Sequence, residues 1–214
     1  MRSEQPMPGN PWPHEMTITV EDRPNALLEL LWIREAYGLR LVGDHLPPPL
    51  VDSPPAVTGG TSTPATRGAW EEAWPRIWDG AAAHAGAEAD PSQFERLGLT
   101  GPGSIERAEL LRRMVGPTWR DEFGDDAFAD DSYNRWLQIG MDAHLAKLPI
   151  SLEDHPERRD LAVLIPAWRA GLTKVVTIPC AGEYVHRVGA HGLLMTDGTR
   201  EDSDAYRRAL RSFA

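Results

Sequence analysis

The sequence predicts an α+β fold that is mostly helical and ends in a small C-terminal antiparallel three-stranded meander and a closing helix. Apolar residues recur at helical spacing through much of the chain up to about residue 171. Three short β-rich segments separated by glycine-containing turns then occupy residues 173–196. The final segment, 202–213, carries Tyr206, Leu210 and Phe213 on one helical face. Helices followed by a compact sheet are typical of the α+β class.

A chain of 214 residues is long enough to bury a substantial core without disulfides or metals. Residues 1–15 are interrupted by prolines and contain no apolar run, which predicts a mobile N-terminal arm. We interpret residues 16–214 as a single globular domain. Residues 17–22 alternate like a short strand, and the helix after Pro24 places Leu27, Leu31 and Trp32 on one face before a stop at Gly38.

Residues 47–68 are rich in proline, glycine and threonine, a composition that favours an internal loop or linker. Trp70, Trp74 and Trp78 follow at helical spacing, so their side chains lie nearly one above another. Pro75 predicts either a bend in this helix or a new helix that begins near Trp74.

Three further helices are predicted before the strands. Ser104 is a candidate N-cap for a helix that ends near Gly116, with its apolar side formed by Ile105, Ala108, Leu111 and Val115. A second helix covers about 132–148, and a third covers about 156–171 with an internal proline.

The first candidate site lies in the predicted meander. Cys180, Glu183, His186 and His191 fall within a short stretch, and a turn near Gly189 could bring the two histidines together. His186 and His191 with a thiolate or carboxylate are candidate zinc ligands, and the same residues could act as nucleophile, base and orienting group. The alternative is structural, with a buried Cys180 and two surface histidines.

Two other features have a functional and a structural interpretation. The acidic run suits calcium or magnesium chemically, but its order does not fit an EF-hand, so a solvated loop with helix capping is the alternative. Its members are Asp121, Glu122, Asp125, Asp126, Asp130 and Asp131. The Trp70, Trp74 and Trp78 ladder could anchor an interface or line a ligand cleft, and otherwise belongs to the core. The Asp44–His45 pair and the GPGS turn at 101–104 are weak indications of function by themselves.

Charge and composition exclude several classes of function. The net charge of −10 disfavours binding to nucleic acid. The longest apolar runs, 27–33 and 161–165, fall far short of the ~20 residues that span a bilayer, so no membrane segment is expected. A single cysteine excludes an internal disulfide and favours a reducing compartment, from which we predict a cytoplasmic protein.

No nucleotide-binding, protease or kinase motif is present in the sequence, and no motif implies a cofactor. We therefore predict a noncatalytic protein-interaction module of the immunity, antitoxin or assembly kind, with a basic protein as its partner, because complementary charge speeds encounter. The alternative is a small hydrolase or metal-dependent enzyme that uses Cys180, His186 and His191. A ligand-binding module with a tryptophan-lined cleft is a third hypothesis. Nothing in the sequence indicates the oligomeric state.

Overall fold

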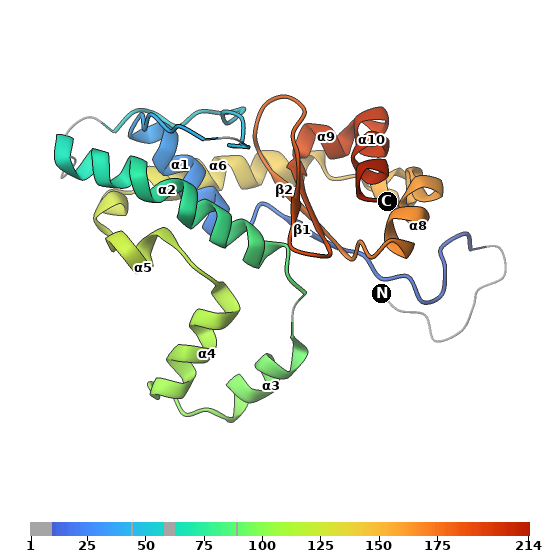
Figure 1. Cartoon of the computed structure of the whole chain (residues 1–214), viewed down its shortest axis with the longest axis horizontal. Helices are drawn as coiled ribbons and strands as arrows, with labels where there is room; N and C mark the ends of the chain where they lie inside the picture. Colours follow the sequence, from blue (N-terminus) through green and yellow to red (C-terminus); the bar gives the residue numbers. More distant parts are fainter. Residues whose placement is uncertain (1–9, 44, 58–62, 89) are drawn as a thin grey trace.

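The computed structural model describes residues 10–43, 45–57, 63–88 and 90–214 (Figure 1). The strands are β1 (Thr19–Asp22), β2 (Lys174–Ile178), β3 (Val185–Val188) and β4 (Gly192–Thr196). The first helices are α1 (Asn25–Ala36), α2 (Pro64–Ala85), α3 (Pro91–Leu99), α4 (Ile105–Val115) and α5 (Trp119–Phe123). The later helices are α6 (Ser132–Lys147), α7 (Pro156–Arg159), α8 (Leu161–Arg169), α9 (Asp197–Glu201) and α10 (Ser203–Phe213). Short 3-10 turns lie at Asp126–Phe128 and Leu152–Asp154.

The strands form one mixed sheet in the order β1-β2-β4-β3. β1, β2 and β4 run parallel, and β3 pairs antiparallel with β4 at the sheet edge. The α+β class and the closing helix are thus confirmed, but the predicted three-stranded antiparallel meander is wrong. Among the described strands, only β3 and β4 form a β-hairpin, because the loop after β2 carries the chain past the position of β4. β4 then returns parallel to β2, and β1, from the N-terminal part of the chain, completes the sheet.

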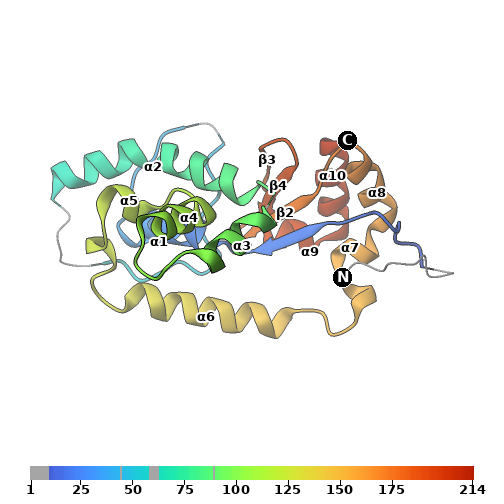
Figure 2. The ribbon, with the colours of Figure 1, turned by 90° about the horizontal axis from the view of Figure 1, so that it is seen from below.

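Both faces of the central strands are buried, which explains their continuous apolar sequence. Val176 and Ile178 belong to the core shared with α1 and α2. Val175 and Leu193 point to the opposite face, into the core shared with α8 and α10. The sheet therefore lies between two groups of helices (Figures 1 and 2).

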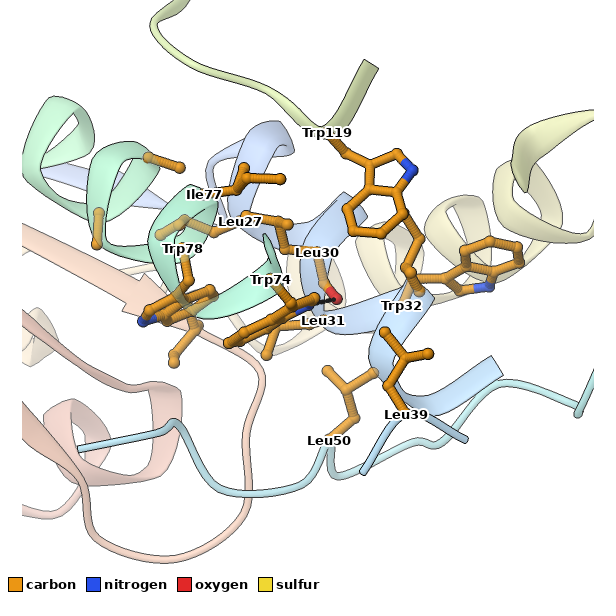
Figure 3. Close-up of a cluster of buried hydrophobic side chains, with 14 of the residues drawn as sticks. Leu27, Leu30, Leu31, Trp32, Leu39, Leu50, Trp74, Ile77, Trp78 and Trp119 are labelled. Atoms are coloured by element: carbon orange, nitrogen blue, oxygen red, sulfur yellow. Dashed lines mark hydrogen bonds between the residues drawn. The ribbon is translucent and has the colours of Figure 1, made fainter. Parts of the chain in front are cut away.

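The larger core is rich in tryptophan, as Figure 3 shows. Trp74 and Trp78 stack with their ring centroids 5.2 Å apart and their planes inclined by 7°. Trp74 Nε1 donates a 2.8 Å hydrogen bond to the carbonyl of Leu30 and so joins α2 to α1. Trp70 packs edge-on against Trp119. These rings pack α1, α2 and α5 against one another.

The loop predicted at 47–68 is shorter than expected. α2 begins at Pro64 with Thr63 as its N-cap and continues through Pro75 as one helix. The residues before the undescribed segment 58–62 pack on the body, since Leu50 forms a β-bridge with Cys180. Arg34 also donates to the carbonyl oxygens of Pro47 and Pro48. This part of the loop is therefore placed by specific contacts.

α3 and α4 form a hairpin, residues 91–115, that projects away from the body in Figure 1. Ser104 caps α4 as predicted, by accepting from the amide of Arg107. The predicted apolar side does not form the packing face, because Leu110 is the buried residue of α4. Ile105 and Leu99 are 80% and 88% exposed. α3 was not predicted from the sequence.

The predicted helix at 156–171 is interrupted at Asp160, between α7 and α8, while Pro166 lies inside α8. The buried Asp160 carboxylate accepts hydrogen bonds from Ser203 and Arg207 of α10 and from Arg159. Burial acts to raise the pKa of this carboxyl, but the contacts with Ser203, Arg159 and Arg207 together hold it below the usual range. Residues 1–9 of the predicted arm lie outside the described residues. The guanidinium carbon of Arg158 lies over the ring of Trp12, 4.9 Å from its centroid. Trp12 Nε1 donates a hydrogen bond to the carbonyl oxygen of Met16.

Candidate functional site

The residues predicted as a catalytic or metal site do not gather in one place. Cys180 follows the carboxyl end of β2, whereas His191 precedes β4 beside the start of β2, where its backbone carbonyl accepts from Thr173. At about 3.3 Å per residue, the length of β2 keeps these groups about 20 Å apart. His186 lies on the edge strand β3 beside the ring of His45. Glu183 forms an exposed ion pair with Arg208.

Cys180 lies in an environment that keeps its thiol protonated. Burial raises the pKa of the thiol to about 12, although nearby Arg34 acts in the opposite direction. A thiolate is the nucleophilic form of cysteine, so this position disfavours attack at neutral pH. Among the described residues, no group of three histidine, cysteine, aspartate or glutamate side chains is arranged to hold a metal ion.

The tryptophan ladder and the acidic run both have structural uses. Trp70, Trp74 and Trp78 are at most 3% exposed, so they build the core and present almost no surface to a partner. In the acidic run, Asp121 completes a capping box with Thr118 at the start of α5. Asp125 pairs with Arg120, and Asp130 accepts from Ser132 at the start of α6. Asp44 lies outside the described residues.

The structure instead shows a pocket of about 220 Å³ at the carboxyl ends of the three parallel strands. Each of these strands is followed by residues that line the pocket: Arg23 after β1, residues 179–182 after β2, and Asp197 after β4. Leu50 and α6 close the other sides. In open parallel sheets the crevice outside the carboxyl ends of the strands is the usual place for a ligand.

The pocket has an apolar body with a few polar groups. Its apolar wall consists of Leu28, Leu50, Trp136, Leu137, Met141, Pro179 and Cys180. The most enclosed charged groups are Arg23 and Asp197, whose side chains are only 13% and 15% exposed. Lys147, Glu201 and Asp52 also line the pocket and are exposed. An apolar cavity with a small number of placed polar groups is typical of small-molecule sites.

The Arg23–Asp197 pair leaves one carboxylate oxygen unused. Nε and Nη2 of Arg23 both donate to Asp197 Oδ2, at 3.0 and 2.6 Å. Nη1 of Arg23 donates to the carbonyl of Gly140 on α6, at 2.7 Å. Asp197 Oδ1 is buried and has no hydrogen-bond partner within the described part of the chain. Such an atom is costly unless a donor reaches it.

Arg23 is held in this position by its backbone as well as its side chain. Its φ of 55° lies in the left-handed region that non-glycine residues rarely adopt. Its amide donates to Thr177 of β2, which continues the pairing of β1 one residue beyond the strand. Strained backbone of this kind is found preferentially at binding and catalytic sites.

α6 lines the pocket and is joined to the body by polar contacts as well as by the apolar packing of Tyr133, Trp136 and Leu137. Figure 2 shows this helix running along one side of the molecule. Tyr133 is the buried residue of this helix, and its hydroxyl donates to Asn25. Trp136 Nε1 donates a 2.9 Å bond to the carbonyl of Asp52. The carbonyl oxygen of Gly140 accepts the hydrogen bond from Arg23 Nη1. These contacts fix the helix over the pocket while leaving much of its apolar surface, including Ile139, exposed.

A larger cleft of about 510 Å³ lies between the α3–α4 hairpin and the body. Its most buried polar group is Glu29, and burial raises the pKa of that carboxyl despite hydrogen bonds from Arg120 and Asn25. Lys174 pairs with Glu21 at 2.6 Å, and His84 Nε2 lies 3.0 Å from the carbonyl of Met114. The buried charged groups of this cleft, Glu29 and Lys174, thus have charged partners, whereas Asp197 Oδ1 has no hydrogen-bond partner among the described residues. For this reason we regard the carboxyl-edge pocket as the better candidate site.

No protein-family model, curated protein or solved structure matches this chain. Every helix among the described residues is too short or too polar to cross a lipid bilayer.

Sequence reasoning identified Cys180 but missed the other polar residues of the pocket. Arg23, Asp197 and Gly140 are far apart in the sequence, and none belongs to a recognisable motif. Arg23 and Asp197 each follow a strand directly, and in a parallel sheet such residues lie at the same edge. The sequence did not reveal this shared edge, because the strands were not predicted to lie parallel in one sheet.

Proposed function

We propose that this chain is a noncatalytic ligand-binding protein whose carboxyl-edge pocket holds a small, largely apolar molecule. The observation that carries the proposal is the apolar pocket at the ends of three parallel strands. Its volume of about 220 Å³ exceeds the roughly 150 Å³ cavity that holds benzene and falls below the roughly 300 Å³ of the smallest drug-sized sites. A single ring with a short chain is therefore the expected size of ligand.

A neutral probe of this size, 2-phenylethanol, tests the proposal by calorimetric titration. We expect binding to the unaltered protein and its loss in Ala143→Trp, because Ala143 lines the pocket and is exposed, so an indole there fills the cavity. Ala146→Trp is the matched control, on the same helix and outside the pocket lining. Absence of binding to the unaltered protein, or equal binding to both variants, would contradict the proposal.

A second candidate function is the predicted docking of a basic protein partner. The hairpin exposes Phe94, Leu99 and Ile105, and exposed apolar groups on a projecting element are typical of interaction surfaces. The acidic run at 121–126, at the end of α5 and in the turn after it, follows the hairpin closely in sequence and would attract a basic surface. A partner from the native host should lose affinity in Ile105→Ser and at high salt. Binding that survives both changes would argue against this function.

The hydrolase alternative stays a prediction. It requires a reactive Cys180, whereas we expect the folded protein to resist alkylation at neutral pH and to react after denaturation.

A further inference from the structure

We infer that two copies of this chain associate through helix α4 of the projecting hairpin, with the two α4 helices packed antiparallel across a two-fold axis. The inference goes beyond the proposed function, because it concerns a surface that shares no residue with the carboxyl-edge pocket. It depends on an apolar stripe that α4 leaves exposed, on the anchoring of the hairpin, and on the order of charges along the helix.

α4 exposes a continuous apolar stripe. Ile105, Leu111 and Val115 are 80%, 41% and 56% exposed, and Ala108 is exposed between them. At about 100° per residue, this spacing keeps all four side chains within about a third of the helix circumference. Among the described elements, α3 and α4 pack chiefly on each other. Helices of nine and eleven residues are marginal by themselves, so the hairpin gains stability when this stripe is covered.

The hairpin is anchored at both ends, so it does not readily fold back over its own stripe. At its start, Gly86 lies so close to Val188 that a β-carbon on the glycine would overlap the valine. At its end, Gly116 is packed as closely against the ring of His84, and His84 Nε2 lies 3.0 Å from the carbonyl oxygen of Met114. Figure 1 shows the hairpin projecting from the body between these two roots. The stripe is therefore more easily covered by another molecule.

A second copy is the occupant that the charges of the hairpin favour. Residues 91–115 contain three glutamates and four arginines, so the hairpin is close to neutral, whereas the whole chain has a net charge of −10. Two copies can therefore meet at this surface without the repulsion that their acidic bodies would cause. A basic partner would be attracted to the acidic run at 121–126 rather than to the stripe itself.

The order of charges along α4 sets the orientation of the two helices. Glu109 and Arg112 are exposed and lie on one flank of the stripe, three residues apart. In an antiparallel pair centred midway along the stripe, Glu109 of one copy lies beside Arg112 of the other, and the two-fold axis repeats this contact. Ile105 then faces Val115 of the other copy. In a parallel pair, like charges would face each other instead, so the antiparallel arrangement is favoured.

Sedimentation equilibrium of the full chain tests the association at concentrations from about 1 μM to about 1 mM. We expect a reversible equilibrium between monomer and dimer in the unaltered protein. Ile105→Asp should raise the dissociation constant about a hundredfold or more, because each copy then buries an unpaired carboxylate in the contact. Ile150→Asp is the matched control, since Ile150 is fully exposed and lies outside the hairpin, and it should leave the dissociation constant unchanged.

Exchange of the flanking charges tests the antiparallel arrangement. Glu109→Arg alone places two arginines together at both symmetric contacts, so we expect the dissociation constant to rise about tenfold. Arg112→Glu alone should have a similar effect. The double variant restores opposite charges and should recover most of the original affinity. The same exchange at Glu106 and Arg113, on the opposite side of α4 from the stripe, is the control and should change nothing.

Each outcome decides for or against the inference. A chain that stays monomeric up to about 1 mM overturns it, whether the stripe remains exposed, closes over the hairpin cleft or binds a different protein. A dimer that keeps its affinity in Ile105→Asp uses another surface and also overturns it. Failure of the double charge variant to recover affinity contradicts the antiparallel pairing. Should Ile105→Asp unfold the hairpin, as seen by circular dichroism, the charge exchange decides the matter.

Discussion

The indole of Trp74 combines two roles in the core, since its ring stacks on Trp78 and its Nε1 bonds to the carbonyl of Leu30. Trp74→Phe removes both part of the buried ring and this hydrogen bond. We expect it to lower the free energy of unfolding by about 2 to 4 kcal/mol, measured by denaturant titration. Trp78→Phe is the matched control, because Trp78 is equally enclosed in the core and its indole has no described hydrogen bond. Equal losses in the two variants would show that the Leu30 contact adds nothing.

Glu29 has a pH-dependent effect on stability whose sign follows from its environment. Burial raises the pKa of this carboxyl in the folded protein, whereas the unfolded chain has a pKa of about 4.3. The contribution of Glu29 to stability is therefore complete below the unfolded pKa and is lost as the pH rises through the raised folded pKa.

Glu29→Gln removes this titration. We expect the stability of the variant relative to the unaltered protein to improve as the pH rises from about 4 through the folded pKa, and then to level off. Carbon-13 NMR of the Glu29 carboxyl measures the midpoint directly. A midpoint at or below the unfolded value of about 4.3 would contradict the assignment.

Among the elements, the α3–α4 hairpin depends on how closely its C-terminal root approaches α2. Gly116 has a φ of 77°, and a β-carbon there would overlap the ring of His84. Gly103, in the turn between α3 and α4, has the same φ but open space around it. Both positions have a positive φ, but Gly116 also has a ψ of −173°, a backbone conformation that essentially only glycine adopts. Only Gly116 also requires the absence of a side chain.

The two glycines give a matched pair of substitutions. We expect Gly103→Ala to cost about 1 to 2 kcal/mol through its backbone conformation alone. Gly116→Ala should cost about 1 to 3 kcal/mol more, because of its glycine-only backbone conformation and the overlap with His84. Thermal and denaturant unfolding measure both. If the two variants are equally stable, the root of the hairpin is not closely packed against α2.

Local patterns in the sequence predicted many of the elements but not their pairing. The stop at Gly38, the cap at Ser104 and the closing helix depend on neighbouring residues, and the structure confirms them. The predicted antiparallel meander is wrong because β3 does not pair with β2 and lies one position further along the sheet. The sequence of a short strand and its turn is the same in both arrangements, so local pattern cannot distinguish them. β1 joins the sheet from the other end of the chain, and local spacing carries no information on such a contact.

At the scale of the whole molecule, the pocket is assembled from five separate parts of the chain. Arg23, the segment at Leu50, α6, the loop after β2 and the start of α9 meet only because β1, β2 and β4 run parallel. Cys180 was predicted as a candidate catalytic residue because its thiol is reactive in other settings, yet in this pocket it contributes a buried apolar surface. The site therefore follows from topology, and the sequence could not predict it without the strand order.

The ligand-binding role of the carboxyl-edge pocket can be tested by mapping amide chemical shifts in the ¹⁵N-labelled protein during titration with 2-phenylethanol. We expect the largest shifts on Gly140, Ala181, Gly182 and Gly198, which line the pocket from three separate parts of the chain. Shifts confined to residues of the hairpin cleft, such as Gln93 and Val115, or no saturable shifts at all, would contradict it.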